Sequence, residues 1–295
     1  MPSNLLLTGI IIMVVGANLL GVKDGFAKMA VLETGPVFLA WLQYIATWVF
    51  VAGIIVVREG PAKLIPTPFP LQLLRGVLVT VTPLQFFLSA QYIPLAESHA
   101  LLFTGPLLTV VWSKFLLKEH VGPHRWLAVI CGFAGILIVL RPDFSQAQIG
   151  HLFAFGCGVT QSFYFIINKR AAELSTPLAS IAHSVIFGSV LLLPLVLWNW
   201  PDISAAQLPT LGWFALFGAI GQSLLILAFS YAPTSLIAPF HYSIIISSIA
   251  FGWVAFDYFP DAITFLGIAL VITAGVYIGR REAQLNSKAK VEIQP

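Results

Sequence analysis

The residues of this sequence whose types could do chemistry are few, and they lie within apolar runs. Glu97 and His99 stand two positions apart in YIPLAESHALLFTGP, Asp24 and Lys28 stand four apart, and His241 lies in APFHYS with no charged residue near it. A carboxylate and an imidazole in apolar surroundings can exchange a proton or hold a polar ligand. An acid four residues before a lysine forms a favourable ion pair on one helix face. These residue types fit proton transfer, ion pairing or ligand binding.

The composition predicts the solvent in which these side chains sit. Hydrophobic residues make up 58% of the 295-residue chain, charged residues only 9%, and the mean hydropathy is +0.92. A soluble domain typically has about 25% charged residues. We therefore expect a protein embedded in the lipid bilayer, where each ionisable side chain must face a cavity, a partner or an interface because its burial is costly.

The elements that must position these residues are expected to be transmembrane helices of about 20 residues each. Positions 203–256 contain no Asp, Glu, Lys or Arg, and at 1.5 Å per residue such a run is far longer than the ~30 Å hydrocarbon core requires. We place a turn at YAPT, 231–234, because Pro233 disfavours helix in the residue before it. The predicted spans are 5–30, 36–57, 71–92, 98–117, 124–140, 149–168, 178–198, 210–230, 234–256 and 261–280.

Basic residues predict the orientation of these spans. The sequence holds 15 Lys and Arg residues, and with a cytoplasmic N-terminus only Lys23, Lys28 and Arg141 fall outside. This is the bias of the positive-inside rule. The first residues lack the basic n-region of a signal peptide, so we interpret them as a retained first span. We expect a multi-pass protein of a bacterial-type inner membrane with both termini cytoplasmic.

An internal repeat organises the chain. When Tyr92 and Pro94 are aligned with Tyr231 and Pro233, the two helices that follow have matching lengths. We predict one repeat over 1–144, a second over 145–281 and a cytoplasmic tail over 282–295. Five spans per repeat is an odd number, so the second repeat is inserted upside down. Inverted repeats place a substrate site near the midplane, between the halves.

Two long runs of the chain resemble the EamA-type drug/metabolite transporter family. Residues 73–142, from LLRGVLVTVTP to ILIVLRP, look like its first half, and 231–282, from YAPTSLIAPFHYS to GRRE, look like its second. The resemblance includes Asp24-x-x-x-Lys28 and the KEHVGPHRW turn. It implies an all-α membrane protein of ten helices in two inverted five-helix repeats. The implied activity is secondary transport of a small polar organic metabolite, such as an amino acid or a related compound, by alternating access.

The chain departs from the family pattern at two positions. Gln43 stands in span two where many relatives have arginine, and the acidic residue usual late in span nine appears as Asp257. The missing arginine leaves two interpretations open, a different substrate charge or an arginine that is structural in the relatives.

We consider Glu97, His99, Asp24 and Lys28 as coupling or gating residues. On a helix, Glu97 and His99 point roughly 200° apart, so the two side chains do not form one compact site. The alternative is that they cap the outer end of span four, where the helix dipole favours a carboxylate. Asp24 and Lys28 form either a structural ion pair near the outer interface or a gate that breaks and forms at the mouth.

A second group of polar residues lies within the spans and could line a substrate cavity. Pro239 removes one backbone donor and loosens the helix near His241 and Tyr242. His241 is either cavity-lining or a packed histidine with a partner on another helix. Amide and hydroxyl groups in other spans could join it or only bond between helices. Together they suit a polar or zwitterionic solute, and the predicted substrate-binding residues are His241, Tyr242, Gln85, Gln161, Tyr164, Gln222 and Gln43.

Other classes of function are disfavoured by the sequence. It contains no HExxH motif, no paired Cys/His spacing and no Walker-type GxxxxGK[ST] motif, so we expect no enzyme, no metal, no cofactor and no ATP-driven pump. A net charge of +3 is too small to suggest nucleic acid. The expected partners are a small-molecule substrate, the bilayer and protons as coupling ions, with the oligomeric state left open. A channel or a flippase for lipid or lipid-linked sugar remains the alternative.

Overall fold

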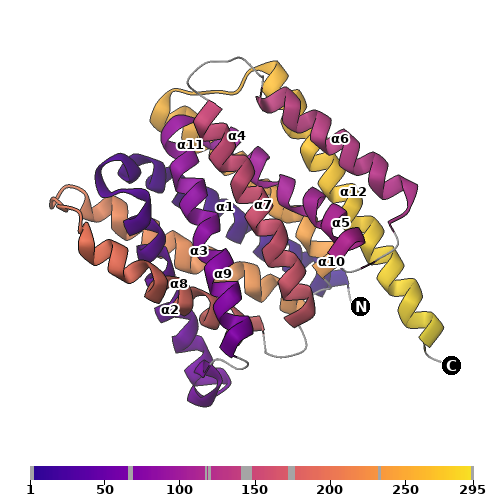
Figure 1. Ribbon diagram of the computed structural model, residues 1–295, viewed down its shortest axis with the longest axis horizontal. Coiled ribbons are helices and arrows are strands. Elements are labelled where there is room, and N and C mark those ends of the chain that lie inside the picture. The colour runs from indigo at the N-terminus through magenta and orange to yellow at the C-terminus, as the bar shows by residue number, and fades with distance from the viewer. Residues whose placement is uncertain are drawn as a thin grey trace.

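The computed structural model describes residues 3–65, 69–116, 118, 121–140, 148–171, 177–231 and 234–293, and every regular element in these ranges is helical (Figure 1). The side chains of a few helix-end residues, including 168–171 and 282–293, are outside this description. The elements are α1 (Ser3–Thr34), α2 (Pro36–Arg58), η1 (Pro61–Leu64), α3 (Phe69–Tyr92), α4 (Leu95–Leu102), α5 (Thr104–Leu116), α6 (Pro123–Leu140), α7 (Gln148–Ala171), α8 (Pro177–Trp198), α9 (Leu208–Tyr231), α10 (Thr234–Ile237), η2 (Ala238–Ser243), α11 (Ile244–Phe256) and α12 (Ala262–Ile293).

The expected ten-span, all-helical fold is confirmed. Within the described residues, ten segments are long and apolar enough to cross a membrane, from Leu5–Thr34 to Ala262–Arg281. Many large apolar side chains point outward, as lipid contact requires; Val57, Val254 and Trp198 are each more than four-fifths exposed. The turn predicted at YAPT is only partly described, because residues 232 and 233 lie outside the described ranges.

The helices pack in pairs that repeat between the two halves of the chain. α1 packs on α9 and α3 packs on α7, which is the same relation with the halves exchanged. α2 packs on α8, and α6 lies along α12 at one edge of the bundle (Figure 1). α1 occupies the middle, where it contacts α9, α11, α3 and α2. Two repeats of five spans predict that each helix pair between the halves has an equivalent pair with the halves exchanged.

Two spans are interrupted at prolines, one in each half. α4 ends at Leu102 and α5 begins at Thr104, with Phe103 between them. The break precedes Pro106 because the proline ring excludes the carbonyl four residues before it, that of Leu102. In the second half, the loosening expected at Pro239 is present as the 3-10 segment η2.

Small residues allow the helices to approach closely. The Gly135 and Gly267 backbones lie so near each other that a Cβ on either would come within 2.8 Å of the other's carbonyl oxygen. A Cβ on Gly132 would touch Leu107, and one on Gly158 would lie 3.0 Å from the Leu101 carbonyl oxygen. These contacts place the backbones of α6, α7 and α12 against their neighbours, as close packing of membrane helices requires.

Replacing Gly158 by alanine is therefore expected to destabilise the fold by about 1–3 kcal/mol, because its methyl group meets the backbone of Leu101. Thermal unfolding of the purified protein measures the effect. Gly53→Ala is the matched control, since a Cβ there meets nothing within 4 Å. Equal stability of the two variants would contradict the close α4–α7 contact.

Candidate functional site

A buried ion pair lies on α1, toward the side of the bundle where α1 ends at Thr34, here called the Thr34 side. Lys23 Nζ and Asp24 Oδ1 are 2.5 Å apart, and both side chains are more than nine-tenths buried. Oδ1 has no aligned hydrogen bond among the described residues, so the contact is ionic. Lys23 Nζ also donates to Gln43 Oε1 at 3.1 Å and lies over the rings of Phe87 and Phe214.

His99 connects this pair to the second half of the chain. Its Nε2 lies 3.2 Å from Asp24 Oδ2, and its Nδ1 lies 3.0 Å from the Leu95 carbonyl and 3.1 Å from Ser248 Oγ on α11. The carbonyl and the carboxylate only accept, so both bonds form together when each ring nitrogen carries a proton. Ser248 Oγ itself donates to the Ile244 carbonyl and can accept from the ring. We call Lys23, Asp24, Gln43, His99 and Ser248 the central charged cluster.

Glu97 belongs to a different network, nearer the Thr34 side. Tyr258, after α11, donates its hydroxyl to Glu97 Oε1 at 2.5 Å, and His151 Nε2 on α7 lies 3.3 Å from Oε2. One carboxylate therefore joins α4, α7 and the segment after α11. Glu97 and His99 have no side-chain partner in common among the described contacts, which agrees with the divergence expected from their spacing.

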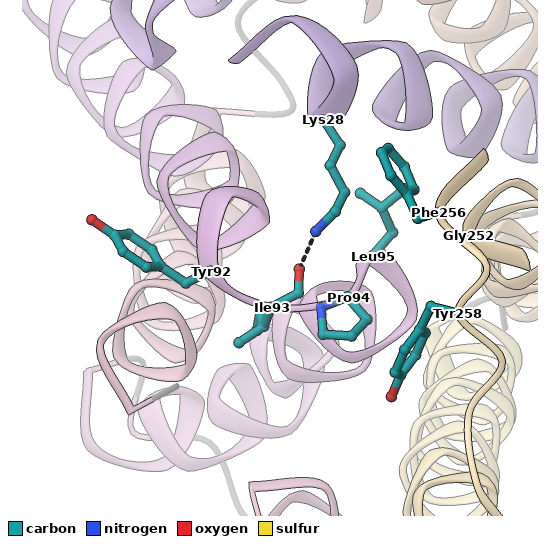
Figure 2. A pocket seen from close by; sticks show the side chains of 8 residues that line it. All are labelled: Lys28, Tyr92, Ile93, Pro94, Leu95, Gly252, Phe256 and Tyr258. Carbon is teal, nitrogen blue, oxygen red and sulfur yellow. Dashed lines mark hydrogen bonds between the residues drawn. The ribbon is translucent and has the colours of Figure 1, made fainter. Parts of the chain in front are cut away.

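Lys28 borders a pocket of about 230 Å³ on the same side. Figure 2 shows its side chain reaching from α1 to the turn between α3 and α4, with the Tyr92 ring pointing away from it. Lys28 Nζ donates to the carbonyls of Ala90 and Ile93 at 2.7 and 2.6 Å and lies over the Phe256 ring. The pocket is lined by Lys28, Tyr92, Ile93, Pro94, Leu95, Gly252, Phe256 and Tyr258.

The prediction that Asp24 pairs with Lys28 is wrong. Asp24 is engaged by Lys23 and His99, and Lys28 holds the α3–α4 turn through backbone carbonyls. The reason is that Lys23 and His99 already contact the two oxygens of the buried Asp24 carboxylate, so the i+4 lysine is not its partner.

His241 and Tyr242 lie on η2 beside the α4–α5 break. Tyr242 is buried with its ring 4.2 Å from that of Phe103, and His241 makes an edge contact with the same ring at 5.9 Å. His241 Nδ1 is buried and has no hydrogen-bond partner among the described residues. A buried ring nitrogen without a partner carries a desolvation cost that a bound polar group can offset.

The remaining predicted polar residues are spread along the bundle. Gln85 Oε1 accepts from Thr160 between α3 and α7, and Gln161 lies against Gly105. Tyr164 lies under the guanidinium of Arg75, with 5.9 Å between the group and the ring centroid. Gln222 is half-buried on α9. Of the predicted substrate-binding residues, Gln43 is the one whose hydrogen bond to the central charged cluster is seen in the described part of the chain.

Four residues of these networks were missed by sequence reasoning: Lys23, His151, Ser248 and Tyr258. Lys23 and His151 carried a usable signal, since each is an ionisable residue within a predicted span. Ser248 and Tyr258 carried none, because serine and tyrosine are ordinary in membrane helices and only the fold brings them to His99 and Glu97. Among the described residues, no group of three or more His, Cys, Asp or Glu could hold a metal ion.

Comparison with known proteins identifies the family. The model of the EamA-like transporter family matches residues 7–141 and again residues 148–280. The chain belongs to the EamA-like transporter family. The double match assigns one copy of the family unit to each half, in line with the paired packing of the helices.

Relatives within the family are transporters of small metabolites. The chain is 26% identical to a riboflavin transporter of Vibrio cholerae, over 75% of each chain. It is 27% identical to an S-adenosylmethionine uptake transporter of Rickettsia bellii, covering 75% of this chain and 76% of the relative. A solved crystal structure has the same fold, with a TM-score of 0.67 at 18% identity over 94% of this chain and 99% of the other. This chain is a small-metabolite transporter and not an enzyme.

The buried ion pair of the central charged cluster predicts that one substitution destabilises the protein and that a second one restores its stability. Asp24→Asn should lower the free energy of unfolding by about 3–5 kcal/mol, because it leaves the Lys23 ammonium buried without a counter-charge. Adding Lys23→Met should recover most of that loss. Thermal unfolding of the single and double variants tests the coupling, and simple additivity of their effects would contradict a buried ion pair.

Proposed function

We propose that this chain is a secondary transporter that moves a small zwitterionic organic metabolite, an amino acid or a compound with an amino-acid group, by alternating access. The observation that carries the proposal is the buried Lys23–Asp24 pair, which lies between helices of both halves and offers both signs of charge. A zwitterion carries a carboxylate, which can pair with Lys23 in place of Asp24, and an ammonium, which can pair with Asp24 in place of Lys23. Exchange of partners keeps both buried charges paired while the solute is bound.

The aromatic walls of the cluster fit the chemistry of the named relatives. Phe87 and Phe214 flank Lys23, and Phe86 packs edge-on against His99 with 4.7 Å between ring centroids. Such rings can stack on a planar substrate. S-adenosylmethionine combines a planar base with an amino-acid group, and riboflavin has a planar ring system. These two compounds are therefore the first solutes to test.

The family unit occurs twice with five spans each, so we propose that the second repeat is inverted and that the halves rock about the central cluster. The excess of basic residues on the other face favours a cytoplasmic N-terminus in the bacterial inner membrane. In this orientation the Thr34 side faces outward, and the pocket beside Lys28 is the outer mouth (Figure 2).

We propose protons as the coupling ion. His99 satisfies Asp24 and the Leu95 carbonyl together only with both ring nitrogens protonated, and loss of the Nε2 proton breaks the contact between α4 and Asp24 on α1. Glu97, held by Tyr258 and His151, closes the outer mouth while those bonds last. A proton taken up from outside can release the Glu97 contacts before it reaches His99 and Asp24.

Counterflow in proteoliposomes tests the function directly. Vesicles loaded with unlabelled S-adenosylmethionine, riboflavin or an amino-acid mixture are diluted into the labelled compound. A carrier gives saturable, transient accumulation of the labelled solute that depends on the internal load. Flux that does not saturate and shows no counterflow would instead indicate a channel, and lipid scrambling without solute uptake would indicate a flippase.

His241→Ala should abolish uptake of the solute identified in that assay while the protein stays folded, because the partnerless Nδ1 beside Phe103 is available to a ligand. Size-exclusion chromatography and thermal unfolding verify folding. His124→Ala is the matched control, since His124 is exposed at the start of α6. Uptake by the His241 variant at the parent rate would remove this residue from the site.

Glu97→Gln should weaken the response of uptake to an imposed pH gradient, because the amide cannot take up the proton that opens the Tyr258 and His151 contacts. The ratio of initial rates with and without the gradient is the measurement. Glu33→Gln, at an exposed carboxylate on the same side, should behave like the parent. A parental ratio in the Glu97 variant would exclude Glu97 from coupling.

A further inference from the structure

Arg75 is a buried cation outside every network described so far. It lies on α3 near the side of the bundle where α2 ends at Arg58, opposite the outer mouth, and only 2% of its surface is exposed. One guanidinium nitrogen, Nη1, donates to Gln72 Oε1 at 2.8 Å, and the group lies over the Tyr164 ring. Its Nε is buried and has no hydrogen-bond partner among the described residues.

The charge of Arg75 is not balanced by the described structure. Arginine stays protonated in proteins, and a buried cation without a counter-charge is costly. Lys23 has Asp24 within 2.5 Å, whereas the contacts of Arg75 are an amide and an aromatic ring, with no carboxylate among the described residues. A guanidinium with free donors has the geometry that binds carboxylates and phosphates.

A second incompletely bonded group faces the same region. His183 lies on α8, which packs closely on this part of α3: a Cβ on Gly76, next to Arg75, would lie 3.4 Å from the carbonyl oxygen of Ser184, next to His183. Its Nε2 is 2.9 Å from the Lys63 carbonyl, which can only accept, so Nε2 carries the proton. Nδ1 of His183 is buried and has no partner among the described residues. α3 packs on both α7 and α8, so Arg75, Tyr164 and His183 belong to one contact region.

We propose that Arg75, with Tyr164 beside it and His183 opposite, binds an anionic group of the transported solute. The inference rests on the proposed transport function and narrows its substrate class to solutes that carry a carboxylate or a phosphate. Lys23 is the cation toward the outer mouth, and Arg75 is the cation toward the opposite side. The anionic group of the solute moves from the first to the second as the halves rock.

The first test asks whether Arg75 is a structural residue. Arg75→Gln removes the unbalanced charge, so the purified full-length variant should unfold at the same temperature as the parent or a higher one. A residue paired within the fold would instead lose stability on this change. A fall of about 5 °C or more in the unfolding temperature would overturn the proposal.

The second test uses small anions as probes and requires no transport. Sodium acetate and sodium phosphate are titrated against sodium chloride at constant ionic strength, with the unfolding temperature as the readout. We expect at least one of the two to raise it by roughly 3 °C in the parent, because binding to the folded state stabilises it. The rise should vanish in Arg75→Gln and persist in part in Arg75→Lys. No rise in the parent would overturn the proposal.

The matched control is Arg125→Gln. Arg125 is also a buried arginine with a partnerless Nε, but it lies in the first turn of α6, away from Tyr164 and His183. The anion response should survive this change, and its loss there instead of at Arg75 would contradict the assignment. Phosphatidylglycerol is tested alongside in delipidated samples. Stabilisation through Arg75 by this lipid alone would assign the anion to a lipid headgroup and overturn the substrate role.

Because neither test measures transport, their failure is distinct from failure of the carrier hypothesis. A protein that shows counterflow but no anion response is a carrier without an anion site at Arg75. A protein that binds acetate through Arg75 but shows no counterflow has the site and lacks the proposed transport activity.

Discussion

The Asp24 carboxylate is the charge on which the rest of the structure depends. In a bundle surrounded by lipid, a carboxylate more than nine-tenths buried is tolerated only with close cationic or donor partners. Lys23 supplies one from the same helix, and His99 supplies another from α4. Because His99 also reaches Ser248 on α11, the two halves of the molecule meet at this carboxylate. A change in the charge or the partners of Asp24 therefore alters contacts in both halves of the molecule.

The charged and polar contacts are distributed along the axis of the bundle. The network around Glu97 lies nearest the Thr34 side, the central charged cluster comes next, and Arg75 with His183 lies toward the opposite side. Between them, Gln85 bonds Thr160, and the Tyr44 hydroxyl donates to the Val79 carbonyl. A polar solute that followed this axis, as we propose, would meet hydrogen-bonding partners at each level, which would limit the free-energy cost of leaving water.

The sequence was sufficient to predict the fold because a helix that crosses the bilayer must be apolar over a fixed length. Apolar runs of span length, separated by prolines and charges, predicted the ten spans closely, and Pro239 correctly marked a weakened helix. It was not sufficient for the partners of the buried charges. Helical spacing alone joined Asp24 to Lys28, whereas the tertiary fold brought His99, from a distant span, to the carboxylate. Tyr258 and His151 likewise reach Glu97 only through the packing of three elements.

The interruptions at Phe103 and at η2 lie against each other, with the Phe103 ring tilted against that of Tyr242 and edge-on to that of His241. Each interruption has already given up part of its backbone hydrogen bonding, so bending there breaks few further bonds. A rocking motion that used these two points as a common hinge would move the ends of the two spans while the packed α6–α12 edge stayed intact. The energy barrier of this motion would then depend on how easily the Phe103 ring slides over the rings of Tyr242 and His241.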